Sequence, residues 1–317
     1  MPKKKYYLIF FAIVLQDIYS QSEPKPDLID TPKDKILCIS IPKCGTHLLK
    51  KCLALINPKN SVSYSNKIGL KNVVQRLIRK RIKLNKNPAP PHHFKGNYDI
   101  PTVGVLPHFL VDLLKKTSET VVHEHWPYTK ESEDFFYKNT RANFFIIRDP
   151  RDHIVSMAFF LHKGLKGQDA PVQDLMLDFI DGRKKHYISW GVFINDAYPL
   201  LYEHGVTEFY KLYLPWMHAR NFCLVKFENL VGPQGGGTQD DQLEEIEKIA
   251  CHVGIKLTIK HRESITQVLF GNSATFREGM IGGWKKHFTP EMKQAFKNAP
   301  GAAQLLIDLG YEKDMNW

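Results

Sequence analysis

A short basic loop near the start of the chain has the composition of an anion-binding site. The loop, residues 42–46 (PKCGT), follows residues 36–41, an apolar run of strand length. Gly45 lets the backbone approach an anion closely, and a helix that starts there would aim free amide groups at the same point. The Lys43 ammonium and the Thr46 hydroxyl add two donors. The nucleoside triphosphatase pattern GxxxxGK[ST] is absent, so the loop alone is equally compatible with an ordinary strand-to-helix turn.

Two later segments carry groups of the same kind. Residues 148–156 (RDPRDHIVS) place Arg148 after an apolar run, and its planar guanidinium suits a phosphate group. If the chain folds back at this point, Ser156 lies near the mouth of the same site. Residues 276–289 (FREGMIGGWKKHFT) offer Arg277 and the amide groups of a glycine-rich loop. Taken singly, residues 148–156 are equally compatible with a solvated helix start, and residues 276–289 with a surface loop.

Taken together and in this order, the three segments resemble the motifs of the sulfotransferases that use 3′-phosphoadenosine 5′-phosphosulfate (PAPS). The family's PKSGTTWL is similar to PKCGTHLL at residues 42–49, and its paired Arg and Ser match Arg148 and Ser156. Its third motif, RKGxxGDWKNxFT, is similar to REGMIGGWKKHFT at residues 277–289. The resemblance spans residues 36 to about 290. It implies transfer of a sulfuryl group from PAPS to a hydroxyl or amine acceptor, which yields adenosine 3′,5′-bisphosphate and requires no metal.

The resemblance also implies roles for single residues. The 5′-phosphosulfate end of the donor would bind Lys43, Gly45, Thr46 and His47. The 3′-phosphate would bind Arg148, Ser156, Arg277 and Gly279. Cys44 and Glu278 complete the expected donor site, and Phe227 matches an aromatic position beside adenine. His125, in the segment VHEHWP, lies where the family has its general base, and Lys43 would neutralise charge on the leaving phosphate.

The chain departs from the family pattern at five of these positions. Cys44 replaces a Ser, Leu48 an adenine-stacking Trp, His123 a Lys beside the base, Glu278 a Lys and Gly283 an Asp. The changes affect adenine stacking and one catalytic cation. They leave two other interpretations open: a catalytically inactive module that binds a nucleotide or another anion, and a degenerate nucleotide kinase, which would need magnesium.

Short apolar runs that alternate with helical patterns predict an α/β fold. Strands are expected at residues 36–41, 120–123, 143–147 and 221–227, and helices at 46–56, 240–253 and through most of 171–217. This order predicts a parallel sheet covered by helices on both faces, with a phosphate-binding strand-loop-helix of the P-loop-like sulfotransferase type. Ligands of such sheets bind at the carboxyl ends of the strands, and we expect each motif to lie at such an end.

The N-terminus resembles a secretory signal peptide. Three lysines at residues 3–5 precede an apolar run at residues 6–15 and a polar end. We therefore expect a signal peptide over residues 1–20, a linker over 21–34 and a sulfotransferase domain over 35–317. The run is short for a transmembrane helix, and an uncleaved N-terminal segment is the alternative. Export is the expected location, with the cytoplasm as the alternative.

The cysteines indicate neither a disulfide framework nor a zinc site. Their number is odd and none is spaced as CxxC: Cys38, Cys44, Cys52, Cys223 and Cys251. We expect four of them to pack as small apolar residues, with Cys44 set apart by its place in the basic loop. Free thiols suit a reducing compartment, which opposes the expectation of export.

The net charge of +11 is concentrated in an expected insertion at about residues 58–100. The stretch from 57 to 98 contains no acidic residue and carries Lys59, Lys67, Lys71, Arg76, Arg79, Lys80, Arg81, Lys83, Lys86 and Lys95. Such a surface would attract an acidic acceptor or an anionic membrane. No nucleic-acid partner is expected. The sequence names neither the acceptor nor the oligomeric state.

Overall fold

A computed structural model describes residues 34–60, 62, 114, 120–164, 171–182, 198–271 and 276–317. The expected signal peptide and all but the last residue of the expected linker lie outside these residues. Of the expected basic insertion, only residues 58–60 and 62 are described. Within the described ranges, no helix is both long enough and apolar enough to cross a membrane.

The described strands form a four-stranded parallel sheet in the order β2-β1-β3-β4. The strands are β1 (Ile36–Ser40), β2 (Val121–Glu124), β3 (Ala142–Ile147) and β4 (Phe222–Lys226). All four were predicted, and each observed end lies within one residue of the predicted one. β1 and β3 are buried along their whole length because helices cover both faces of the sheet.

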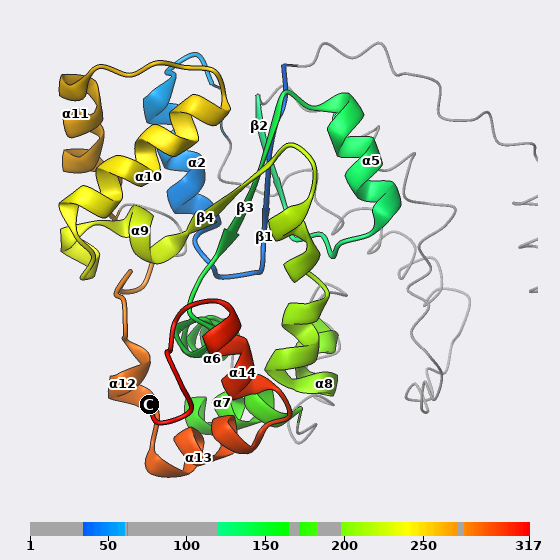
Figure 1. The fold of residues 1–317 in the computed structure, drawn as a ribbon. Helices are drawn as coiled ribbons and strands as arrows, with labels where there is room; N and C mark the ends of the chain where they lie inside the picture. The colour runs from blue at the N-terminus through cyan, green and yellow to red at the C-terminus, as the bar shows by residue number, and fades with distance from the viewer. Residues whose placement is uncertain are drawn as a thin grey trace, which may run out of the picture.

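One face of the sheet is covered by the helix that follows β1 and by helices from the C-terminal half. They are α2 (Thr46–Ile56), α9 (Phe227–Val231), α10 (Gln239–His252) and α11 (Ile259–Leu269), grouped on one side of the sheet in Figure 1. Leu49, Leu53 and Ile246 are buried between these helices and the strands. The predicted helices at 46–56 and 240–253 are confirmed, the second shifted by one residue.

The other face and the carboxyl edge of the sheet carry the remaining helices. They are α5 (Lys130–Asn139), α6 (Pro150–Gly164), α7 (Val172–Asp181), α8 (Tyr198–Lys211), α12 (Trp284–His287), α13 (Pro290–Asn298) and α14 (Ala302–Asp308). Two 3-10 turns, η2 (Leu214–His218) and η3 (Pro233–Gly235), flank β4 in the chain. Figure 1 shows α6, α7 and α12–α14 together beyond the carboxyl ends of the strands.

Two expectations about the core are refined. Trp190 and Phe193 lie outside the described residues, as do the side chains of Tyr198 and Tyr202, and the described aromatic core of this region is Phe209, Tyr210, Tyr213 and Trp216. The cysteines are all free, but only Cys38, Cys44 and Cys52 are buried. The expectation that Cys251 packs as an apolar residue is wrong, because it lies on the exposed side of α10.

Four helices begin with the same side-chain cap. Thr129, Thr238, Thr258 and Thr289 each accept a hydrogen bond from the amide three residues further on. Helix α2 differs, because Gly45 precedes it and no side chain caps its amide groups. The first turn of α2 therefore keeps donors that a ligand can use.

His153 gives this fold a sensitivity to acid. Its ring on α6 is fully buried and stacked on Phe209, with ring centroids 6.2 Å apart and planes 13° apart. Burial, helped by the charge of Arg148, lowers the pKa of His153 from 6.5 to about 3. As the pH falls below the ordinary pKa, the unfolded chain binds a proton that the folded protein excludes, so stability is full above that pKa and is lost below it.

We predict that His153→Phe, which keeps a stacked ring but cannot titrate, makes unfolding less dependent on acid. Between about pH 6 and pH 4, the free energy of unfolding of the wild type should fall more steeply, by about 1.4 kcal/mol per pH unit. Urea unfolding of both proteins across this window measures the two slopes. The other histidines titrate alike in both proteins, so equal slopes would contradict the assignment.

Candidate functional site

The strand order brings the predicted motifs to one edge of the sheet. β1 lies between β2 and β3, so the chain turns to opposite sides after β1 and after β3, and ligands of open α/β sheets bind at this reversal. The loop at residues 42–45 follows β1, and Arg148 follows β3. His125 follows β2, and Phe227 follows β4. Residues distant in the sequence therefore surround one point.

The loop after β1 has a backbone that few residues adopt. Lys43 and Gly45 have φ angles of 71° and 108°, in the left-handed region. A Cβ atom at Gly45 would lie 2.8 Å from Cδ2 of Phe227 and 3.1 Å from Cδ1 of Ile146, so only glycine fits. The positive φ of Lys43, a non-glycine residue, is backbone strain of the kind that is frequent at functional sites.

His125 is held in one neutral form. Its Nδ1 lies 2.9 Å from the carbonyl oxygen of Ser40, which can only accept a hydrogen bond, so Nδ1 carries the proton. The Ser40 hydroxyl lies 3.0 Å from the same nitrogen and 2.5 Å from the Thr46 hydroxyl. Burial lowers the pKa of His125 to about 4, and the charge of Lys43 acts in the same direction. At neutral pH, Nε2 therefore presents a lone pair that can accept a proton.

Three cations act on one another at this edge. Burial and the charges of Arg148 and Arg277 together lower the pKa of Lys43 to about 8, and burial is the largest cause. Arg148 also lowers the pKa of Arg277, although burial is the larger cause. The Lys43 ammonium lies 4.3 Å from the centre of the Phe160 ring. Mutual repulsion of cations that the fold holds together indicates a site for an anion.

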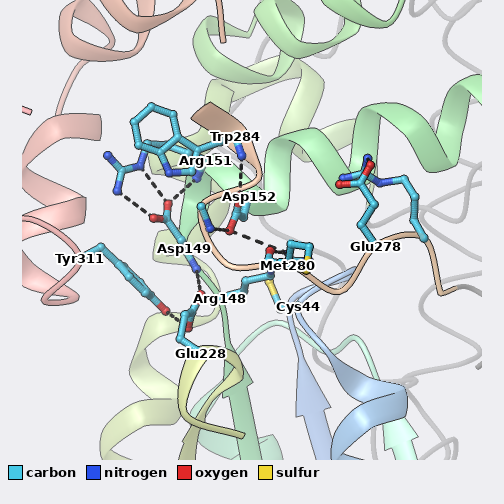
Figure 2. Close-up of polar contacts among 12 residues, drawn as sticks. Cys44, Arg148, Asp149, Arg151, Asp152, Glu228, Glu278, Met280, Trp284 and Tyr311 are labelled. Carbon is cyan, nitrogen blue, oxygen red and sulfur yellow. Dashed lines mark hydrogen bonds and ion pairs between the residues drawn. The ribbon is translucent and has the colours of Figure 1, made fainter. Parts of the chain in front are cut away.

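Arg148 combines a stacked and a hydrogen-bonded position. Its guanidinium lies 4.2 Å from the centre of the Phe227 ring. It also donates to the carbonyl oxygen of Met280 at 2.8 Å (Figure 2). Asp152 lies 3.9 Å from it. The residue is 7% exposed, and within the described part of the chain its buried Nε has no hydrogen-bond partner. A buried donor without a partner is costly, and an anion would satisfy it.

Arg277 and Glu278 form an ion pair at 2.8 Å, and the Arg277 guanidinium lies 4.5 Å from the centre of the Phe159 ring. Both side chains are partly exposed. Gly279 has a φ of 66°, and a Cβ atom there would lie 2.6 Å from the Phe276 ring. Glu278 thus partners a predicted binding cation, and an incoming phosphate would compete with its carboxylate.

Asp152 anchors the loop that contains these residues. Its two carboxylate oxygens accept hydrogen bonds from the amides of Gly282 and Trp284, each at 2.8 Å. The Ile281 amide donates to the carbonyl oxygen of Gly235 at 2.8 Å. These bonds hold the Met280 carbonyl at Arg148. Sequence reasoning did not identify Asp152, although it lies within the RDPRDHIVS segment.

Asp149 and Arg151 fix the turn between β3 and α6 (Figure 2). The Asp149 carboxylate accepts from Arg151 Nε at 3.1 Å and from its terminal nitrogen at 2.8 Å. The Arg151 guanidinium also lies over Trp284 and Trp317, 4.1 Å and 4.6 Å from the ring centres. Through these contacts the last residue of the chain supports the site, a connection that no local pattern reveals.

Glu228 ties the same turn to the C-terminal region. It accepts hydrogen bonds from the Asp149 amide at 2.8 Å and from the Tyr311 hydroxyl at 3.0 Å. Burial raises the pKa of Glu228 to about 7.

The remaining predicted residues have different surroundings. The Cys44 thiol is buried 3.9 Å from the Tyr210 hydroxyl, and burial raises its pKa to about 12. The Cys44 amide donates to the Ile41 carbonyl, so this residue maintains the loop through both groups. Ser156 is partly buried on α6. Leu48 is part of α2 and packs against the hydrophobic core on that face of the sheet. The binding and catalytic roles of all the predicted site residues stay predictions.

Two further histidines and one lysine lie near His125. The ring of His123 is 6.4 Å from that of His125 and 6.2 Å from that of His47, centre to centre. Lys50 on α2 is fully buried, and its Nζ lies 2.7 Å from Nδ1 of His123. No sequence motif pointed to Lys50, which lies on a face of α2 where an apolar residue is expected. Among the described residues, no group of three or more His, Cys, Asp or Glu side chains could hold a metal ion.

The chain belongs to the sulfotransferase family, since the model of the sulfotransferase domain matches residues 33–303. It is 26% identical over 272 residues to cytosolic sulfotransferase 17 of Arabidopsis thaliana, covering 82% of this chain and 71% of the relative. It is 24% identical over 301 residues to 3-alpha-hydroxysteroid sulfotransferase of Cavia porcellus, covering 86% of each chain.

The fold is similar to that of mouse sulfotransferase SULT7A1, solved in complex with PAP, with a TM-score of 0.55 and 15% identity over 90% of each chain. The predicted family and fold class are confirmed.

We predict that Asp152→Ala loosens the loop at residues 276–284. Loss of both carboxylate bonds should speed hydrogen exchange of the Gly282 and Trp284 amides by about tenfold, equivalent to about 1.4 kcal/mol of local protection. Asp152→Asn keeps one acceptor oxygen and should protect one of the two amides. Unchanged exchange of both amides in the alanine variant would show that Asp152 does not anchor the loop.

Proposed function

We propose that this chain transfers a sulfuryl group from PAPS to a hydroxyl or amine acceptor and releases adenosine 3′,5′-bisphosphate. The observation that carries the proposal is the mutual approach of Lys43, Arg148 and Arg277 at the carboxyl edge of the sheet. PAPS carries anionic groups at both its 5′ and 3′ positions, so it needs cations at two places. The names of the relatives and the PAP in the similar solved structure support the same donor.

The described residues fit this donor. The uncapped first turn of α2, the Lys43 ammonium and the Thr46 hydroxyl form one cluster of donors for the 5′-phosphosulfate. The unpartnered Nε of Arg148 and the partly exposed Arg277 form a second, for the 3′-phosphate. Phe227, between Gly45 and Arg148, offers an aromatic surface beside both.

The reaction then needs one proton acceptor and one stabilised leaving group. Nε2 of His125 takes the proton of the acceptor's hydroxyl or amine while the acceptor's oxygen or nitrogen forms a bond to sulfur. The bond between sulfur and the bridging oxygen of the donor breaks, and its electron pair stays on the 5′-phosphate. Lys43 stabilises that charge. The rest of the catalysis is alignment of the acceptor with the sulfuryl group. Buried hydrogen bonds that hold the side chains of the site in place favour this alignment.

The first test is a screen of hydroxyl and amine acceptors with labelled PAPS. We expect transfer by the wild type and a loss of turnover of about a hundredfold or more in His125→Ala, with PAPS affinity retained. The control is His218→Ala, which removes an exposed histidine at the end of η2. PAPS binding without transfer to any acceptor would instead identify an inactive nucleotide-binding module. Full turnover by His125→Ala would exclude this residue as the base.

The second test uses the lowered pKa of Lys43. Its ammonium form is the one that attracts the donor, so the charge is present below about pH 8 and is lost above it. The Kd for PAPS should therefore rise about tenfold per pH unit above that pKa, until the pKa of the complex is reached. Binding measured by calorimetry from about pH 7 to pH 9.5 gives the slope.

Lys43→Arg is the control for this test, because guanidinium stays charged throughout the window. Burial raises the pKa of Glu124 to about 8, and this group titrates alike in both proteins. The arginine variant should therefore lose the part of the slope that Lys43 causes. Equal slopes would show that Lys43 does not hold the donor.

A further inference from the structure

Lys50 occupies a position that normally belongs to an apolar residue. It lies on the buried face of α2 next to Leu49 and near Leu53, and all three side chains are 0% exposed. Burying a lysine is unfavourable unless its charge is paired or hydrogen-bonded, and an apolar residue of similar volume would often be neutral or stabilising. One partner that the structure provides is the imidazole of His123, with Nζ of Lys50 2.7 Å from Nδ1.

This hydrogen bond sets the protonation of His123. An ammonium group can only donate, so Nδ1 of His123 accepts, and the single proton of the neutral ring must be on Nε2. Burial lowers the pKa of His123 to about 2, and the charge of Lys50 is the next largest cause. His123 is therefore neutral at physiological pH and is an N–H donor at Nε2, polarised by the cation at its other nitrogen.

The neighbouring histidine has the opposite arrangement. His125 donates from Nδ1 to the Ser40 carbonyl oxygen, which leaves a lone pair on Nε2. His123 accepts at Nδ1 from Lys50, which leaves a hydrogen on Nε2. The two rings are 6.4 Å apart, and the two residues are separated by one position at the end of β2. One ring thus presents an acceptor and the other a donor at the same edge of the sheet.

The pair also lies at the end of the site where the phosphosulfate is proposed to bind. The charge of Lys50 acts on the pKa values of His47, His123 and Glu124. The charge of Lys43 acts on those of His47 and His125. His47 is thus within electrostatic reach of both lysines, and its ring lies 6.2 Å from that of His123, centre to centre.

We propose that His123 donates from Nε2 to an oxygen of the transferring sulfuryl group, and that Lys50 fixes and polarises that donor from behind. The proposal rests on the proposed function. In it, His123 contacts the substrate, and Lys50 is a positioning residue that acts through His123. A buried cation on α2 and a neutral ring on β2 then act together beside the base.

The test replaces Lys50 with Met, which keeps the length of the side chain and removes its charge. An apolar residue suits the buried face of α2, so we expect a melting temperature at or above that of the wild type. Turnover of labelled PAPS, with an acceptor found in the screen above, should fall about ten- to hundredfold, mostly in kcat. Affinity for PAP, which lacks the sulfuryl group, should stay within about twofold, while affinity for PAPS falls more.

Two further variants separate this role from a structural one. In the Lys50→Met background, His123→Lys places an ammonium directly at the sulfuryl end and should restore most of the lost turnover. Lys260→Met removes an exposed lysine of α11 and should change nothing. Equal losses of PAP and PAPS affinity in Lys50→Met, or turnover equal to that of the wild type, would overturn the proposal.

A measurement that does not depend on turnover separates the test of Lys50 from the test of the proposed function. Nitrogen-15 NMR of the imidazole groups should show His123 with its proton on Nε2 in the wild type, and a mixture of the two neutral forms in Lys50→Met. The comparison of PAP with PAPS binding also requires no acceptor. If the wild type transfers sulfuryl to no acceptor, the proposed function fails, and these two measurements still decide what Lys50 does.

Discussion

The structure depends on holding three cations together while most of the nearby carboxylates bind other groups. Lys43, Arg148 and Arg277 repel one another. Asp149 pairs with Arg151, Asp152 accepts from two loop amides, and Glu228 accepts from an amide and a hydroxyl. Asp152 also lies 3.9 Å from Arg148, and Glu278 pairs with Arg277, so the positive charge is only partly balanced. The acidic groups therefore brace the backbone around the site, and part of the electrostatic attraction for an anion is preserved.

The sheet could be predicted from the sequence because its strands are buried on both faces and read as continuous apolar runs. The helices were predicted less completely. Nothing in the sequence led us to expect α5, whose KESEDFFYKN sequence is mostly polar, or α11. Both begin at a threonine cap and are stabilised by packing on the rest of the domain, which a local pattern does not contain.

The candidate site was predictable only where a residue's role follows from its place after a strand. Lys43, His125 and Arg148 each follow one, and the parallel sheet brings them to a common edge. Lys50 and Asp152 act through contacts with residues far away in the chain, so their roles appear only in three dimensions. Glu278 shows the converse: its motif position was recognised, but its ion pair with Arg277 became visible only in the fold.

The buried ionisable groups at this edge of the sheet lower the folding stability of the protein. A buried Lys50, a neutral His123 and a neutral His125 are all less favourable than apolar residues would be in the same places. The cost is met by directed hydrogen bonds, and each of these bonds also determines which nitrogen carries a proton. Stability and chemistry are thus joined at the same contacts. Proton positions set by buried partners need no rearrangement when the substrate arrives, which is the property that a preorganised catalytic site requires.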